Sequence, residues 1–164
     1  MTTEAQAYAG ATALGVMAGM RSMSAPALIS QVARKGQLAV EGSKLAFLNS
    51  RGALSATALL ALGELIADKL PVTPARTDAG PLIARAVSGA FSGAVLCSAK
   101  KRSPWLGALY GTLGALGGTF AAYHLRRSVE QNLKLPDVVV AVAEDAVVAS
   151  SAFLIARQLS EGED

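Results

Sequence analysis

The sequence predicts an all-α protein, a bundle of about five membrane-spanning helices with glycine-rich packing in a single domain, residues 1–164. Three observations support this prediction. The chain is 52% hydrophobic but only 5% aromatic, and it contains 16 glycines, so its apolar content comes from small side chains. Charged residues divide it into apolar runs of about 20 residues, the length that crosses a bilayer. These runs lack the polar stripe that soluble helices repeat every 3.6 residues.

The helices are predicted in chain order from the positions of the charges. The first apolar run ends at Arg21 and reaches membrane length only when it is extended into SMSAP. Residues 27–51 are too polar to span, and a short amphipathic helix with an interfacial loop is expected there. Tyr8, Trp105 and Tyr123 lie near run ends, where amphipathic rings favour the membrane interface. The predicted helices are 5–26, 52–68, 81–99, 105–125 and 138–156. A soluble bundle with unusually apolar helices is the alternative.

Glycines recur at spacings that place them on one face of a helix. Gly15 and Gly19 are four residues apart, and the fourth run carries a stripe with spacings of four, three and four. Helices in lipid associate through close backbone approach, which small residues permit. The stripe therefore predicts tight helix packing and a homo-oligomer, with a pore wall or ligand groove as the alternative. GVMAGM and GALGGT also suggest an inverted repeat. The four stripe residues are Gly107, Gly111, Gly114 and Gly118.

Five crossings assign each loop to one side of the membrane. The N-terminus and the loops near residues 69–80 and 126–137 would share one face, and the loops near 21–51 and 100–104 would share the other with the C-terminus. The second face carries nine Lys and Arg residues and the first carries six. The positive-inside rule then favours a cytoplasmic second face, with the N-terminus outside.

Carboxylates are placed inside the apolar runs. Glu64 and Asp68 are four residues apart on the second run, and Glu144 and Asp145 lie within the fifth. Charged groups at such depth are costly and normally face a partner or a wet cavity. We expect Arg85 to contact Glu64 or Asp68, in either an interhelical clamp or an aqueous vestibule that binds a cation or exchanges protons. His124 and Arg126 are expected on the same side.

Arg21 is a separate candidate. It closes the first glycine-containing run and precedes SMSAP, in which Pro26 lacks an amide hydrogen and Ser22 and Ser24 can bond freed backbone groups. Broken helices of this kind form binding sites in transporters. A plain helix end is the alternative.

Other chemistries have little support in the sequence. The single Cys97 excludes an internal disulfide, and with the single His124 it predicts no metal site, no cofactor and no catalytic residues. A net charge of +3 is dispersed along the chain, so nucleic-acid binding is not expected. No signal peptide is predicted, because the residues before the first apolar run are uncharged or acidic.

The residues also carry a family resemblance. AGMRSMSAPALIS, KLAFLNS, GELIADKLPVTPAR, IARAVSGAFSGAVL, LGALGGTFAAYHLRR and LPDVVVAVAEDAVV, in that order, resemble the bacterial integral-membrane family catalogued as domain of unknown function 4126. The resemblance covers nearly the whole chain. It implies a small multi-pass protein of the bacterial inner membrane and supplies no catalytic residues.

The expected function is that of a small channel, carrier or lipid translocase with a charged intramembrane site. Its expected partners are membrane lipids and a small ion or lipid substrate. A non-transporting membrane scaffold or assembly factor, acting through glycine-mediated helix packing, is the alternative, and an enzyme is the reading with least support.

Overall fold

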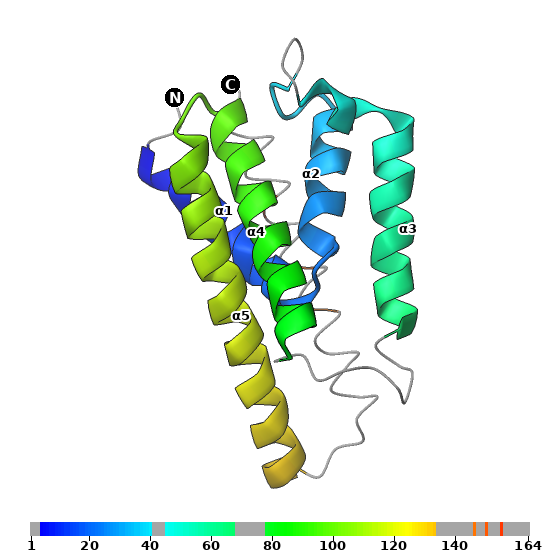
Figure 1. The fold of residues 1–164 in the computed structure, drawn as a ribbon, viewed down its shortest axis with the longest axis vertical. Helices are drawn as coiled ribbons and strands as arrows, with labels where there is room; N and C mark the ends of the chain where they lie inside the picture. The colour runs from blue at the N-terminus through cyan, green and yellow to red at the C-terminus, as the bar shows by residue number, and fades with distance from the viewer. Residues whose placement is uncertain are drawn as a thin grey trace.

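The computed structural model describes residues 4–40, 45–67 and 78–133, with residues 146, 150 and 155. The described residues form five α-helices and one 3-10 helix and contain no strand, which confirms the all-α prediction (Figure 1). Asp68, Glu144 and Asp145 lie outside these residues, as does nearly all of the predicted helix 138–156. The elements are α1 (Glu4–Met20), α2 (Ser24–Arg34), η1 (Ala46–Asn49), α3 (Arg51–Ala67), α4 (Ala79–Ala99) and α5 (Pro104–Leu133).

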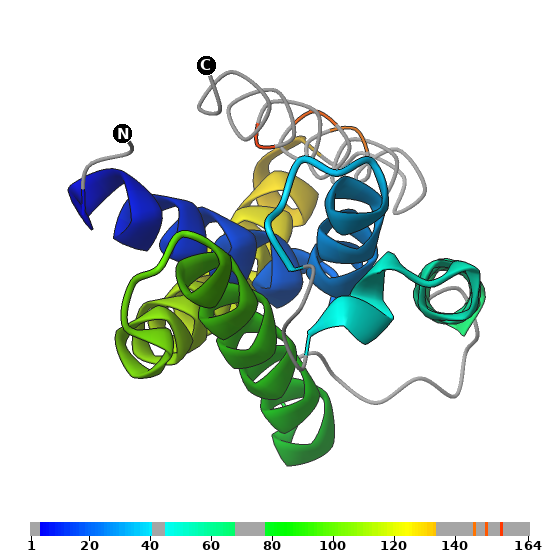
Figure 2. The same cartoon turned by 90° about the horizontal axis from the view of Figure 1, so that it is seen from above.

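Helices α1, α4 and α5 form the centre of the described fold, since each of the three packs against the other two. Helix α2 packs against all of α1, α3 and α4, whereas α3 contacts only α2 and η1 among the described elements. Figure 2 shows α3 at the periphery. The largest fully buried side chains include Leu14 and Met17 on α1, Ile29 on α2, Leu48 on η1 and Leu96 on α4.

The three central helices approach one another at glycines. A Cβ atom added at Gly111 on α5 would overlap the carbonyl oxygen of Gly89 on α4, and one added at Gly15 on α1 would overlap that of Gly111. Side chains other than hydrogen do not fit between backbones at this separation, so the faces that carry these glycines are occupied by the chain's own helices. The same backbone contact occurs at Gly19, Gly93, Gly107, Gly114 and Gly118.

The predicted first helix, 5–26, is two helices in the structure. Helix α1 ends at Met20 and α2 begins at Ser24, so Pro26 lies in the first turn of α2, where a missing amide hydrogen is tolerated.

The segment 27–51, which was predicted to lie at the membrane interface, is packed into the bundle over most of α2. Helix α2 runs alongside α3 and α4 (Figure 1) and buries its apolar stripe, including Ile29 and Val32, inside the bundle. Its amphipathic pattern is explained by this packing.

The break between α1 and α2 changes the topology that five crossings would give. The start of α1 lies near the α4–α5 connection, because the Cys97 thiol is 3.9 Å from the Ala7 carbonyl oxygen and the Tyr8 and Tyr110 rings stack with centroids 5.1 Å apart. Helix α2 returns toward this end (Figure 1). The N-terminus therefore shares an end of the bundle with the 100–103 connection, and the prediction of opposite faces was wrong.

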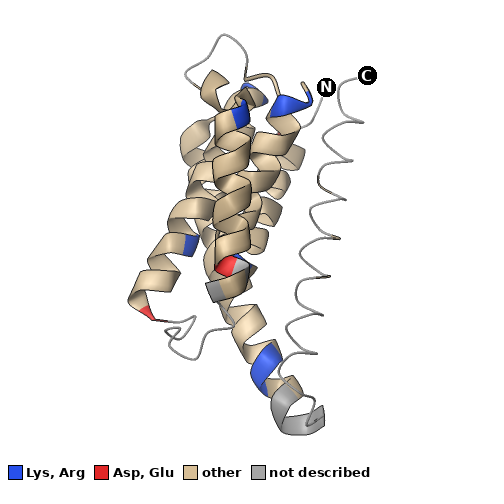
Figure 3. Ribbon diagram, turned by 90° about the vertical axis from the view of Figure 1, so that its right-hand side faces the viewer, with Lys and Arg blue, Asp and Glu red and all other residues tan. Residues whose placement is uncertain are grey.

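The apolar surface of the bundle faces outward. Leu60 on α3 is 57% exposed, Ile83 on α4 is 62% exposed and Leu113 on α5 is 55% exposed. In Figure 3 most Lys and Arg residues lie toward the two ends of the bundle. Of the described helices, α4 is the one long and apolar enough to cross a membrane by length and composition, and α1 and α3 contain only 17 residues each.

Candidate functional site

The break between α1 and α2 has its amide hydrogens satisfied by a carboxylate from another helix. The Glu64 carboxylate on α3 accepts hydrogen bonds from the Ser22 amide at 2.7 Å, the Ser22 hydroxyl at 2.7 Å and the Met23 amide at 2.9 Å. These amides precede α2 and have no helical acceptor. Glu64 therefore fastens α3 to the start of α2, where the positive end of the helix dipole favours an anionic group.

Hydroxyl groups satisfy the carbonyl oxygens at the same break. The Ser24 hydroxyl donates to the carbonyl oxygens of Met17, at 3.1 Å, and Arg21, at 2.6 Å. The Thr119 hydroxyl on α5 donates to the Gly19 carbonyl at 3.0 Å, and the Ser88 hydroxyl on α4 donates to that of Ser22. Helices α3, α4 and α5 thus each contribute one polar side chain to the interruption, as a broken helix inside a bundle requires.

The break lies well inside the bundle. Ser88 is nine residues from the start of α4 and eleven from its end, or about 14 Å and 17 Å at 1.5 Å per residue. Ser88 and Thr119 are 5% and 1% exposed. We call the group formed by Arg21, Ser22, Met23, Glu64, Arg85, Ser88 and Thr119 the break site.

Two arginines belong to the break site. Arg21 immediately precedes the amides that Glu64 binds, and Arg85 lies one turn before Ser88 on the same face of α4 and is 4% exposed. Both arginines have interaction partners within the chain. Cationic, anionic and hydroxyl groups are therefore gathered at one level of an otherwise apolar bundle, an arrangement suited to binding a polar or charged group.

The structure brings together two residues that the predicted topology separated. Five crossings placed Arg21 near one side of the membrane and Glu64 near the other, although Arg21 was also a candidate to complete the site that contains Glu64. In the structure the return of α2 brings Ser22 and Met23, which follow Arg21, into contact with Glu64. Within the described chain, Glu64 bonds to these residues and forms no ion pair with Arg85. The predicted contact of Arg85 with Asp68, and the vestibule with Glu144 and Asp145, stay predictions because those acids lie outside the described residues.

Sequence reasoning missed Ser88 and Thr119. Both are isolated hydroxyl residues in apolar runs, where serine and threonine usually bond to the carbonyl oxygen one turn earlier. Thr119 does make this bond, to Ala115 at 2.8 Å, in addition to the bond that it makes to Gly19. The expectation that Ser24 would bond freed backbone groups is confirmed.

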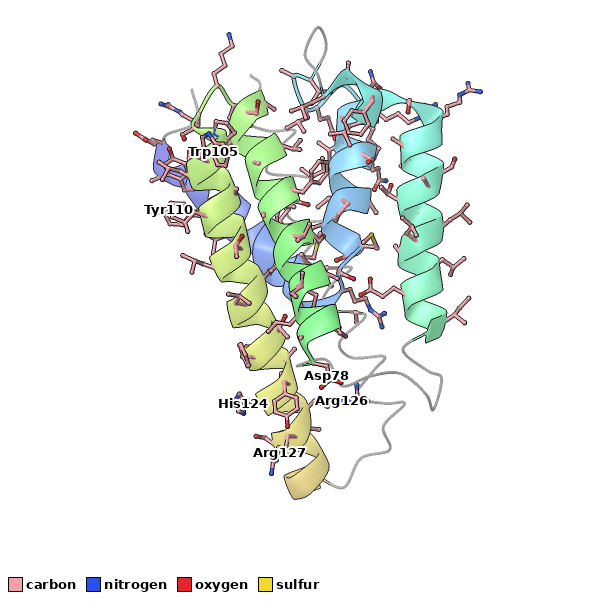
Figure 4. The ribbon with its side chains drawn as sticks, viewed as in Figure 1. Asp78, Trp105, Tyr110, His124, Arg126 and Arg127 are labelled. Atoms are coloured by element: carbon pink, nitrogen blue, oxygen red, sulfur yellow. The ribbon has the colours of Figure 1, made fainter. Side chains whose placement is uncertain are left out.

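His124 and Arg126 were predicted to lie beside the site at the end of the fourth run. In the structure they lie farther along α5, past Thr119 and toward the C-terminal end of the helix. Helix α5 continues to Leu133, eight residues past the predicted end, and Arg126 lies about 10 Å beyond Thr119 along its axis. Figure 4 shows Arg126 and Asp78 near the lower end of α4, with His124 and Arg127 on the other side of α5. In the part of the chain that the structure describes, no three His, Cys, Asp or Glu side chains are grouped to hold a metal.

Comparisons with known proteins give one match. The family described as Domain of unknown function (DUF4126) matches residues 9–157, which is most of the chain and confirms the resemblance. No curated protein and no solved structure matches.

Proposed function

The chain belongs to the DUF4126 family, whose match includes every residue of the break site. We propose that it is a multi-pass protein of the bacterial inner membrane that moves a small ion or a charged lipid headgroup. In this proposal the break site is where the charged group is held as it crosses the bilayer. Arg21, Glu64 and Arg85 supply the charges, and α1 and α2 are the two arms of a helical hairpin that turns at residues 21–23.

The distribution of exposed side chains supports the membrane part of the proposal. Helix α4 spans about 31 Å, close to the thickness of the hydrocarbon core, and α5 has no Lys, Arg, Asp or Glu between Arg102 and Arg126. Exposed large apolar side chains in this number are unusual on a soluble monomer. The exposed apolar residues of these helices and α3 include Leu59, Leu62, Ile66, Val87, Phe91, Leu106 and Leu109.

The single observation that carries the transport part is the bonding of Glu64 to the interrupted backbone inside the bundle. Charged residues at membrane depth are rare and mark substrate or proton pathways. Discontinuous helices place backbone groups where they can contact a solute, which is the design of many secondary transporters. The break site combines both features.

The test uses proteoliposomes and a conservative substitution. Glu64→Gln keeps one carbonyl oxygen for the Ser22 or Met23 amide but removes the charge, and Glu4→Gln removes an exposed carboxylate at the far end of α1 as the control. We expect wild-type vesicles to pass ions or to move labelled lipid between leaflets, and we expect Glu64→Gln to reduce that rate at least tenfold, a change of about 1.4 kcal/mol in barrier height. Glu4→Gln should match the wild type.

Two outcomes would contradict transport. If Glu64→Gln moves ions and lipid as fast as the wild type, the break site is not on the pathway. If wild-type vesicles move neither, the scaffold alternative is favoured. The glycines of α1 and α5 contact the chain's own backbone, so a scaffold would bind its partners through another surface. The outer face of α3, which exposes Leu60 and Leu62, is the candidate.

A further inference from the structure

The end of the bundle that carries the N-terminus is basic, and we infer that it binds the anionic phospholipid headgroups of one leaflet. This inference rests on the proposed membrane location. Six basic residues come from three separate connections at this end: Arg34, Lys35, Arg51, Lys100, Lys101 and Arg102. Glu4 is the acidic residue that the structure describes there, and it accepts a hydrogen bond from Tyr8.

The neighbouring side chains favour a lipid surface as the partner. Trp105 is 83% exposed and follows Arg102 by three residues, and the exposed Leu106 and Leu109 come next on α5. The basic residues therefore come first, then the Trp105 ring, then the leucines. A bilayer has the same order, from charged headgroups through the interface to the acyl chains. Each basic residue close to an anionic leaflet adds electrostatic attraction to it.

Lys101 provides a second, independent observation. It lies in the left-handed backbone region, with φ of 54°, and its amide donates to the Ser98 carbonyl at 3.0 Å as α4 ends. Glycine is the usual residue at this position, because a side chain is strained there. A lysine therefore occupies a position where helix termination alone favours glycine, and this exposed lysine stands between the basic residues Lys100 and Arg102 in the sequence.

The inference also assigns an orientation. Basic connections favour the cytoplasmic side of a membrane, so the basic end, and with it the start of α1, faces the cytoplasm. The sequence favoured the N-terminus outside because five full crossings placed it opposite the 100–103 connection. The return of the chain at Arg21 to Met23 reverses that assignment.

The experiment measures the thermal unfolding of purified protein in detergent after addition of phosphatidylglycerol or phosphatidylcholine. We expect phosphatidylglycerol to raise the Tm of the wild type more than phosphatidylcholine does, with the difference shrinking as salt is added. The variant with Lys35→Gln, Arg51→Gln, Lys100→Gln and Lys101→Gln should lose most of that difference. Arg126→Gln with Arg127→Gln, which alters the opposite end, should retain it.

Lys101→Gly separates the lipid contact from folding. It relieves the left-handed strain and removes one charge, so its Tm in detergent alone should equal or exceed that of the wild type while its phosphatidylglycerol response falls. If the two lipids raise the Tm of the wild type equally, the inference that the basic end binds anionic headgroups is wrong. The proposal that the protein spans a membrane would not be affected. A protein that stays in solution without detergent and responds to neither lipid would overturn both.

Discussion

Gly111→Leu is expected to prevent the chain from folding into its compact bundle. Gly111 lies between α1 and α4, and an added Cβ atom would overlap the Gly89 carbonyl oxygen, while Gly15 approaches from the other side. Overpacking a core usually costs about 1–3 kcal/mol, and here the obstacle is backbone that cannot rotate away, so we expect a loss above about 3 kcal/mol. The measurement is the yield and Tm of detergent-purified protein.

Gly117→Leu is the matched control on the same helix. Gly117 is exposed, and a Cβ atom added to it meets nothing within 4 Å. This variant should purify and unfold as the wild type does. If Gly111→Leu were as stable as Gly117→Leu, the close backbone approach of α1, α4 and α5 would be refuted.

Glu64→Leu is expected to destabilise the protein by roughly 2–4 kcal/mol, because it leaves the Ser22 and Met23 amides without their acceptor. The isosteric Glu64→Gln should recover part of this loss, since its side-chain oxygen can accept one of the two bonds. The free energy of unfolding in a denaturing detergent series measures both effects.

Glu4→Leu serves as the comparison for the loss of a carboxylate. Glu4 is exposed, and its carboxylate accepts a bond from the Tyr8 hydroxyl at 3.1 Å, so this substitution should change stability by less than about 1 kcal/mol. A Glu64→Leu variant as stable as Glu4→Leu would show that the break between α1 and α2 does not depend on Glu64.

The helical class and the positions of two of the five predicted helices could be predicted from the spacing of charges. Predicted ranges 52–68 and 81–99 agree with α3 and α4 to within two residues, because Arg51, Lys69 and Lys100 are unfavourable inside apolar segments. The glycine spacing identified the helix faces that meet in the structure. It could not identify the partner of each face, since any close helix pair gives the same pattern.

The break site was harder to predict because its members are brought together by a reversal of the chain. SMSAP contained the signal for an interruption, but its length was equally compatible with continuing the first helix to residue 26. That choice determined whether Arg21 and Glu64 lay at opposite ends or at one level. The hydroxyls of Ser88 and Thr119 carry no spacing signal, because their acceptors are backbone carbonyls 66 and 100 residues away in sequence.

The central claim, that the break site lies within a bilayer between two aqueous ends, is tested most directly by sided cysteine labelling. Lys101→Cys, Leu113→Cys and Arg127→Cys are exposed positions along α5 and its preceding connection, and the native Cys97 is buried. With a membrane-impermeant maleimide on sealed cells, we predict that position 127 reacts and that position 101, at the cytoplasmic end, reacts only after the membrane is opened. Position 113, although 55% exposed in the isolated chain, should not react in either case. Labelling of 101 and 127 from the same side, or of 113 as fast as either, would contradict the account.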